Sequence, residues 1–222
     1  MSKTQEFYDV LFDANEHVCF GATKYDTQVF PVNVGLKEEH NFFTVNPMLK
    51  GTTRADYNVA VYRNLMFEID EDTEGNSIPK EDQLTILKKS KLPISTILWS
   101  GGKSFHSIVS IADVFVEDKA EYQALWKAIA NVLNKTAEDL GYSIKFDAAT
   151  KNPSRFTRAA GAVRIHADKP NEIQKIAGVN KRISKSEILE WLQSHSVEWS
   201  DYLPKPVEWT GLNTYSDART QE

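Results

Sequence analysis

Apolar residues recur every three or four positions in several stretches of the chain, a spacing that places them on one face of a helix. The clearest stretch is residues 119–142, KAEYQALWKAIANVLNKTAEDLGY, in which Gly141 is suited to end the helix. Shorter stretches of the same kind lie at 4–14, 79–90 and 185–195. The pattern therefore predicts four helices.

Short runs of β-branched and aromatic residues, divided by polar residues, glycine or proline, predict strands between these helices. They lie at 17–22, 28–34, 41–47, 58–72, 94–100, 105–111 and 143–148. The fourth run, NVAVYRNLMFEIDED, begins with alternation and becomes continuously apolar, which is typical of a central buried strand. Because strands and helices alternate, we expect an α+β or α/β domain built on one main sheet.

Composition limits the class of protein. The 222 residues, 41% of them hydrophobic, suit one globular domain with a short appendage. The single cysteine, Cys19, excludes an internal disulfide and disfavours a zinc finger or ribbon. No run approaches the roughly 20 apolar residues of a membrane span, and the first residues lack the apolar run of a signal peptide. We therefore expect an intracellular protein that does not contact a membrane.

Positive charge is concentrated in one part of an acidic chain. The formal net charge is −5, yet residues 143–185 hold 10 Lys and Arg against 3 Asp and Glu. A local basic segment in an acidic protein indicates an anion-binding site, although a solvated basic surface would give the same composition.

The stretch SGGKSFH, residues 100–106, resembles the end of a phosphate-binding P-loop. That motif needs a glycine where Ile97 stands, and it needs a helix after the lysine. Here the alternating run FHSIVSI predicts a strand, so we expect a turn between two strands. Such a turn can still bind phosphate through glycine amides and Lys103, with Ser104 and His106 on one face. An ordinary glycine hairpin with a surface lysine is the alternative.

Three carboxylates stand near predicted strand ends. Glu68 and Asp70 are two residues apart and so share a face, where close like charges favour a divalent cation between them. An acidic turn in solvent is the alternative interpretation. Asp147 ends the strand at 143–148. It precedes a group of basic residues that can bind a triphosphate or a nucleic-acid backbone, or form surface ion pairs: Lys151, Arg155, Arg158 and Arg164.

In this order the three elements resemble the motifs of the archaeo-eukaryotic primase superfamily, especially the primase-polymerases of phages and mobile elements. The matching stretches are NLMFEIDE, SGGKSFHSIV and KNPSRFTRAAGAVR, and FFTVNPM is similar to a stretch that precedes the first motif. The resemblance covers roughly residues 40–166. In the third motif Ala159, Ala160 and Gly161 stand where the family usually continues with Leu-Pro-Gly, which puts the local turn in doubt.

The resemblance implies a DNA primase and DNA-directed polymerase, a nucleotidyltransferase that uses two Mg²⁺ or Mn²⁺ ions. The implied metal ligands are Glu68, Asp70 and Asp147. The implied nucleotide-binding residues are Lys103, Ser104, His106, Arg155 and Arg158. His106 would also act in catalysis with the three carboxylates, by donating a proton to the leaving group. The implied partners are a single-stranded DNA template, NTP or dNTP, and a replicative helicase.

The resemblance also implies an α+β fold with an RNA-recognition-motif-like antiparallel or mixed sheet, flanked by helices and joined to an N-terminal α/β subdomain. We expect a catalytic domain at 1–183, divided at about residue 60, and a C-terminal helix and tail at 184–222. The expected location is the cytoplasm of a bacterial, archaeal or phage-infected cell. Two alternatives remain open: a gap-filling or end-joining repair polymerase of the same superfamily, and a non-catalytic single-stranded-DNA-binding replication module.

Overall fold

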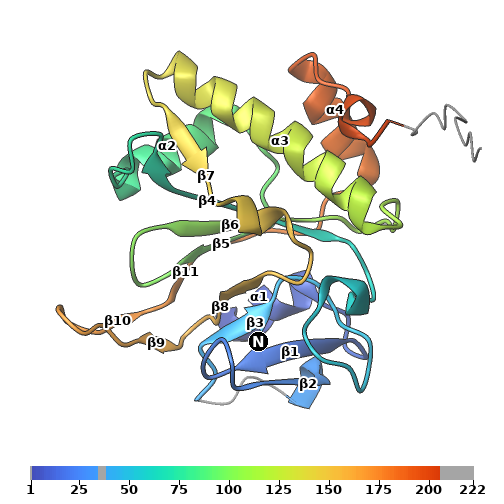
Figure 1. Cartoon of the computed structure of the whole chain (residues 1–222), viewed down its shortest axis with the longest axis vertical. Helices are drawn as coiled ribbons and strands as arrows, with labels where there is room; N and C mark the ends of the chain where they lie inside the picture. The colour runs from blue at the N-terminus through green and yellow to red at the C-terminus, as the bar shows by residue number, and fades with distance from the viewer. Residues whose placement is uncertain (1, 35–38, 206–222) are drawn as a thin grey trace, which may run out of the picture.

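The computed structural model describes residues 2–34 and 39–205. A five-stranded antiparallel sheet lies at its centre, in the order β11-β5-β6-β4-β7. Figure 1 shows this sheet with helices on one side and a second sheet on the other. The central strands are β4 (Asn64–Asp72), β5 (Thr96–Trp99), β6 (Phe105–Ser110), β7 (Ile144–Phe146) and β11 (Lys175–Val179).

Three helices cover one face of the central sheet: α2 (Lys80–Ser90), α3 (Lys119–Asp139) and α4 (Lys185–Ser194). Their ends follow from local chemistry. Asp118 caps α3 by accepting a hydrogen bond from the Glu121 amide, and Ser184 forms a capping box with Glu187 at the start of α4. Gly141 follows α3 with a φ of +84°, a conformation that glycine adopts without strain.

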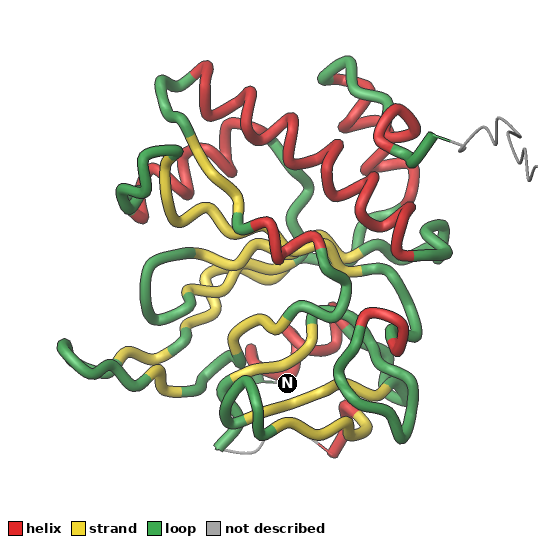
Figure 2. The backbone as a smooth tube through the Cα atoms, viewed as in Figure 1, coloured by secondary structure: helices red, strands yellow, loops and turns green. Residues whose placement is uncertain are grey.

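The other face of the central sheet packs against a four-stranded sheet and a first helix, α1 (Lys3–Leu11). The second sheet has the order β2-β1-β3-β8, with β1 at His17–Gly21, β2 at Thr27–Pro31, β3 at Phe42–Thr44 and β8 at Phe156–Arg158. A separate hairpin pairs β9 (Val163–Arg164) with β10 (Glu172–Ile173). Figure 2 shows most strands of both sheets below helices α2, α3 and α4. Four short 3₁₀ helices complete the fold, at Val32–Val34, Asp56–Asn58, Ala148–Lys151 and Trp199–Tyr202.

Side chains along β4 point alternately to the two faces of the central sheet. Leu65, Phe67 and Ile69 pack into the core beneath the helices. Met66 points the other way, into the core shared with α1 and the second sheet. Glu68 has the same parity as Met66, so the strand directs its carboxylate toward the second sheet rather than toward the helices.

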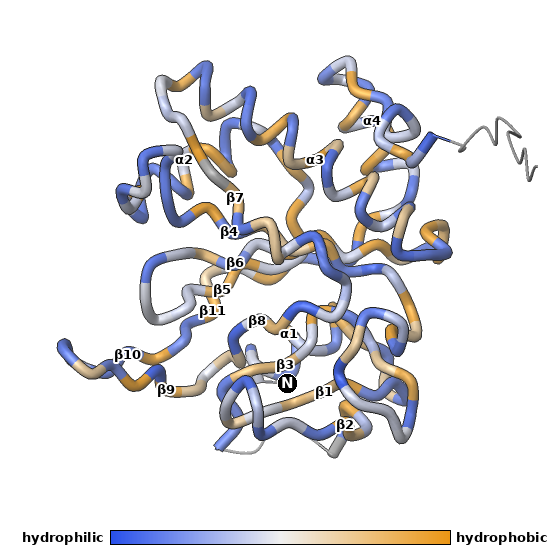
Figure 3. Tube along the Cα trace, viewed as in Figure 1, coloured by the Kyte–Doolittle hydropathy of each residue, from blue (hydrophilic) through white to orange (hydrophobic). Residues whose placement is uncertain are grey.

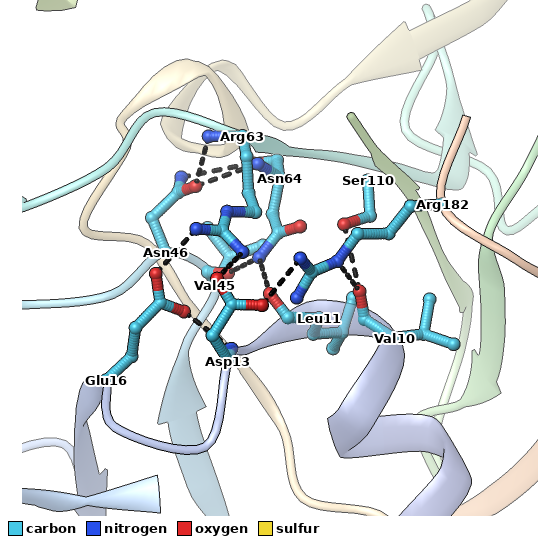
Figure 4. Close-up of polar contacts among 10 residues, drawn as sticks. All are labelled: Val10, Leu11, Asp13, Glu16, Val45, Asn46, Arg63, Asn64, Ser110 and Arg182. Atoms are coloured by element: carbon cyan, nitrogen blue, oxygen red, sulfur yellow. Dashed lines mark hydrogen bonds and ion pairs between the residues drawn. The ribbon is translucent and has the colours of Figure 1, made fainter. Parts of the chain in front are cut away.

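An ion-pair network joins α1 and the two sheets (Figure 4). Arg63, whose side chain is almost fully buried, bonds the carboxylates of Asp13 and Glu16. Arg182 also binds Asp13, at 2.8 Å, and donates to the Val10 carbonyl at the end of α1. A buried guanidinium that loses its partner costs free energy. These contacts therefore hold α1 and the two sheets in one relative position.

The structure corrects several predicted strand boundaries. The strand predicted at 58–72 begins only at Asn64, because the Asn46 side-chain oxygen accepts hydrogen bonds from the amides of Arg63 and Asn64 in place of a neighbouring strand. The strand predicted at 28–34 ends at Pro31 and continues as a 3₁₀ helix. The pattern missed four strands, β8 to β11.

The division of the chain into domains remains a proposal. The second sheet takes its fourth strand, β8, from residues far beyond position 60. Helix α4 contributes Ile188, Trp191 and Leu192 to the same core as α3. The rest of the predicted tail, 206–222 with Trp209, lies outside the described residues. In the described part of the chain, no helix has the length and hydropathy to cross a membrane.

Candidate active site

A cavity of about 190 Å³ opens between the two sheets, where β4 and β6 face β8. Its lining combines opposite charges with two aromatic rings. The acidic and neutral polar residues are Glu68, Asp70, Ser104, His106 and Thr157. The basic residues are Lys24, Arg54, Lys103, Arg155, Arg158 and Arg164, and the aromatic residues are Phe42 and Phe156. The cavity therefore has an acidic wall on β4 and a basic wall built mainly from the segment around β8.

Glu68 is the most firmly held carboxylate of the acidic wall. It pairs in register with His106 on the neighbouring strand, so both side chains lie on one face. Ser104 donates a hydrogen bond to Glu68 Oε1 at 2.6 Å, and His106 Nε2 lies 3.4 Å from the same oxygen. Burial alone would raise the pKa of Glu68, but the charge and hydrogen bond of His106 and the Ser104 hydroxyl lower that pKa to about 2.

His106 connects the two sheets across the cavity. Its Nδ1 lies 2.7 Å from the hydroxyl of Thr157 on β8, while its Nε2 faces Glu68. Both His106 and Thr157 are buried. Sequence reasoning missed Thr157, because nothing in the run RFTR distinguishes a threonine that orients a histidine from an ordinary strand residue. The imidazole is thus fixed at both nitrogens.

Asp70 is a carboxylate without a local counter-charge of its own. Among the described residues, no group donates a hydrogen bond to its side chain and no cation forms an ion pair with it. Its pKa is raised by burial and then by repulsion from Glu68, Glu71 and Asp147, against which Lys103 acts only in part. Such excess negative charge on carboxylate oxygens is the donor chemistry that Mg²⁺ and Mn²⁺ prefer.

Asp147 lies at the end of β7, as its position in the sequence predicted. It caps the following 3₁₀ helix through the Ala149 amide, at 2.9 Å, and forms an ion pair with Arg155. In the described part of the chain no three acidic, histidine or cysteine side chains stand close enough together to hold a metal ion. The carboxylates of Glu68 and Asp70, which line one cavity, have the oxygen-donor chemistry that suits a divalent cation, whereas the carboxylate of Asp147 is engaged by Arg155.

The glycine turn joins two antiparallel strands, as the sequence predicted. Strands β5 and β6 pair directly, and the Ser100 amide bonds the Ser104 carbonyl across the turn. Gly101 has a φ of +68°, which explains one of the two glycines. Lys103 is paired with Glu71 at 2.9 Å, and its side chain is 56% exposed. No helix follows the turn, so it lacks the helix dipole of a P-loop.

Arginines of the basic wall stack on aromatic rings. Arg158 lies over Phe42, with 4.3 Å from Cζ to the ring centre, and Arg54 lies over Phe156 at 4.4 Å. Burial and the nearby Arg164 lower the pKa of Arg158 to about 10, although Glu68 opposes this. Arg54 and Lys24 were missed by sequence reasoning, because they precede the basic segment by about a hundred residues and carry no motif of their own.

The fold was compared with known proteins. No protein-family model and no curated protein matches the sequence. Among solved structures, the archaeo-eukaryotic primase domain of the cyanophage S-2L primase-polymerase superposes with a TM-score of 0.57 at 17% identity, over 85% of this chain and 95% of that one. Primase RepB′ superposes with a TM-score of 0.50 at 11% identity, over 87% of this chain and 62% of that one.

This is the fold of the archaeo-eukaryotic primases. The likeness confirms the predicted α+β architecture with an antiparallel central sheet and flanking helices. In this fold, the predicted site residues line one cavity, with the exceptions of Asp147 and Lys151. Asp147 borders that cavity through its ion pair with Arg155. Because the identities are low, the fold does not assign a role to any of these residues.

Proposed function

We propose that the protein is a metal-dependent nucleotidyltransferase that makes and extends primers on a single-stranded DNA template. The observation that supports this proposal is the composition of the cavity. Two carboxylates, one of them without a counter-charge, face a wall of lysines and arginines, with a buried histidine between the two sets. A nucleoside triphosphate bound with a divalent cation matches both halves of this arrangement.

The carboxylates would hold the cation. Glu68 and Asp70 would be two of its ligands, and Asp147 would be a third if its ion pair with Arg155 opened. The same opening frees the Arg155 guanidinium for a phosphate oxygen, so cation and nucleotide would bind together. When bound, one or two Mg²⁺ or Mn²⁺ ions supply the positive charge that activates a 3′-hydroxyl and neutralises the triphosphate.

The remaining residues would bind and protonate the nucleotide. In the reaction a 3′-oxygen forms a bond to the α-phosphorus, the bond to the bridging oxygen breaks, and pyrophosphate leaves. Lys103, Ser104 and Arg158, which line the cavity, would bind phosphate oxygens. His106, oriented by the Thr157 hydroxyl, would donate a proton to the leaving pyrophosphate, while the proton of the 3′-hydroxyl would pass to solvent.

The non-catalytic alternative is disfavoured by Asp70. A module that only bound single-stranded DNA would gain nothing from a half-buried carboxylate that is repelled by three acidic neighbours and that faces the DNA-binding surface. A replicative helicase as a partner stays a prediction, since no surface of the described residues points to one.

Incorporation of labelled nucleotides on a single-stranded template tests the proposal. The purified chain is incubated with NTP or dNTP in Mg²⁺ or Mn²⁺, with and without an annealed primer. We expect products in both primer conditions. Extension without initiation would favour a gap-filling or end-joining polymerase. DNA binding without any incorporation would support the non-catalytic module and contradict the proposal.

A further inference from the structure

The β9–β10 hairpin presents one face to the glycine turn. Glu172 pairs in register with Arg164, so these two side chains share a face. Glu172 accepts a hydrogen bond from Trp99 Nε1 at 2.9 Å, and His166 Nε2 lies 2.7 Å from the carbonyl oxygen of Gly101. The hairpin alternates polar and apolar positions (Figure 3), and its opposite face carries the exposed Val163. The hairpin is therefore attached to the turn by its polar face.

Gly102 makes room for the side chain of Arg164. A Cβ atom at position 102 would lie 2.0 Å from Arg164 Nη1 and 2.5 Å from Arg164 Cζ, far inside van der Waals contact. The φ of Gly102 lies outside the left-handed region, unlike that of Gly101, so the backbone does not require glycine there. What requires glycine at position 102 is the guanidinium that covers it.

Arg164 also lacks a counter-charge. No carboxylate of the described residues lies within ion-pair distance of it, although it lines the cavity beside the other cations. Burial and then repulsion from Arg164 lower the pKa of Arg158, whereas at Lys103 the ion pair with Glu71 outweighs the repulsion from Arg164 and raises the pKa. Arg158 and Arg164 thus face one cavity without an ion pair to any described carboxylate, and such guanidinium groups are stabilised by a ligand that carries several negative charges close together.

We propose that Arg164, held over Gly102 by the β9–β10 hairpin, binds the phosphate chain of the incoming nucleotide. This inference rests on the proposed function and adds a residue to its site. Phosphates of a DNA strand share the chemistry, but each carries a single charge, whereas a triphosphate concentrates its charge on neighbouring groups. The triphosphate is thus the better match for a guanidinium that stands beside Arg158 and Lys103.

Equilibrium binding tests the assignment without requiring turnover. The probes are dATP, dADP, dAMP and inorganic tripolyphosphate, and a labelled single-stranded oligonucleotide tests the DNA backbone as a source. We expect Arg164→Ala to weaken binding of dATP and tripolyphosphate on the order of 10- to 100-fold, and to leave dAMP and the oligonucleotide much less affected. Lys169→Ala is the matched control, because Lys169 is a partly exposed cation of the same hairpin outside the cavity. It should bind like the wild type.

A double-mutant cycle tests the role of the glycine. Gly102→Ala should weaken dATP binding about as much as Arg164→Ala does, because the new methyl group displaces the guanidinium. In the Arg164→Ala background the same glycine substitution should add less than about a twofold effect. Thermal unfolding of each variant checks that the hairpin and turn remain folded. Arg164→Lys should recover only part of the affinity, since it keeps the charge without the planar fork.

The outcomes separate this inference from the proposed function. Unchanged dATP binding by Arg164→Ala would overturn the assignment, even if the wild type polymerises nucleotides. Loss of oligonucleotide binding alone would overturn it in favour of the DNA backbone. An equal effect of Gly102→Ala with and without Arg164 would contradict the link between the two residues. Loss of triphosphate binding in a protein that does not polymerise would support Arg164 and contradict the proposed reaction.

Discussion

The two walls of the cavity are built in different ways. The acidic wall lies on β4, a nine-residue inner strand of the main sheet, with a core on each face. The basic wall takes Arg158 from β8 and Arg164 from β9, which are three and two residues long, and its other cations from loops and turns. Arg158 and Arg54 stack on rings that are partly buried. The first wall is held by packing on both faces of its strand, and the second by the pairing of a short strand with β3 and by the stacking of arginines on aromatic rings.

This difference assigns different tasks to the two walls. A carboxylate pair that binds a cation needs fixed positions, which a strand packed on both faces provides. Arginines and lysines that bind a polyphosphate need reach, and short strands with partly exposed side chains provide it. Substitutions beneath the acidic wall should therefore unfold the protein, whereas substitutions on the basic wall should change binding.

The largest expected effect is on folding. Phe67 lies beneath the acidic wall, is 1% exposed and stacks on Trp126 with 5.7 Å between ring centres. Phe67→Ala should lower the free energy of unfolding by about 3–5 kcal/mol. Val163→Ala, on the outward face of β9 beside the basic wall, where the side chain is 47% exposed, should change it by less than about 0.5 kcal/mol. Urea denaturation of the two variants measures this contrast, and equal losses would contradict it.

Asp70→Asn should separate activity from stability. Removing the charge takes away a cation ligand, so we expect incorporation to fall by at least about 100-fold. It also removes repulsion from Glu68, Glu71 and Asp147, so the melting temperature without metal should stay the same or rise. Scanning calorimetry with EDTA and a primer-extension assay measure the two effects. A clear drop in melting temperature would show that Asp70 is structural.

Thr157→Val should have a smaller effect that acts across the cavity. It removes the hydroxyl beside His106 Nδ1 while keeping the side-chain volume, so the imidazole loses its fixed orientation. We expect kcat to fall about 10-fold with little change in the KM for nucleotide. Thr157→Ser restores the hydroxyl and should recover most of the rate. If Ser and Val behaved alike, the hydrogen bond would have no part in catalysis.

The smallest expected effect concerns the ion pair between the walls. Arg155 holds Asp147, and both side chains are about one-third exposed, so solvent weakens their interaction. Arg155→Ala should lower the Mn²⁺ concentration needed for half-maximal activity on the order of two- to fivefold, because Asp147 is released. The KM for nucleotide should rise at the same time. A titration of Mn²⁺ at saturating nucleotide gives the concentration for half-maximal activity. An unchanged or higher concentration would argue against the release of Asp147 from Arg155 as a step in cation binding.

The sequence predicted the acidic wall better than the basic wall, for a physical reason. Alternation over a long buried strand places Glu68 and Asp70 on one face without knowledge of the rest of the fold. Strands of two or three residues carry no detectable period, so β8, β9 and β10 were missed. Lys24 and Arg54 reach the cavity only because the second sheet folds against the first, and that is information about tertiary structure.

In the glycine turn, too, the features that depend on distant parts of the chain could not be predicted from the sequence. Its place between two strands followed from the alternation in FHSIVSI, and the structure confirms it. The reason for its second glycine did not follow, because Arg164 lies more than sixty residues further along the chain. The contact between His166 Nε2 and the Gly101 carbonyl also joins residues that are far apart in the chain, so the sequence pattern did not reveal it.

The central claim is that the carboxylates facing the second sheet support nucleotide transfer. It is tested most directly by Mn²⁺-dependent incorporation of nucleotides on a single-stranded template by the wild type, Asp70→Asn and Asp72→Asn. Asp72 belongs to the same strand but lies outside the cavity, and asparagine can keep the acceptor that its turn requires. The account predicts incorporation by the wild type and Asp72→Asn and almost none by Asp70→Asn. Full activity of Asp70→Asn, or no incorporation by the wild type with either Mn²⁺ or Mg²⁺, would contradict it.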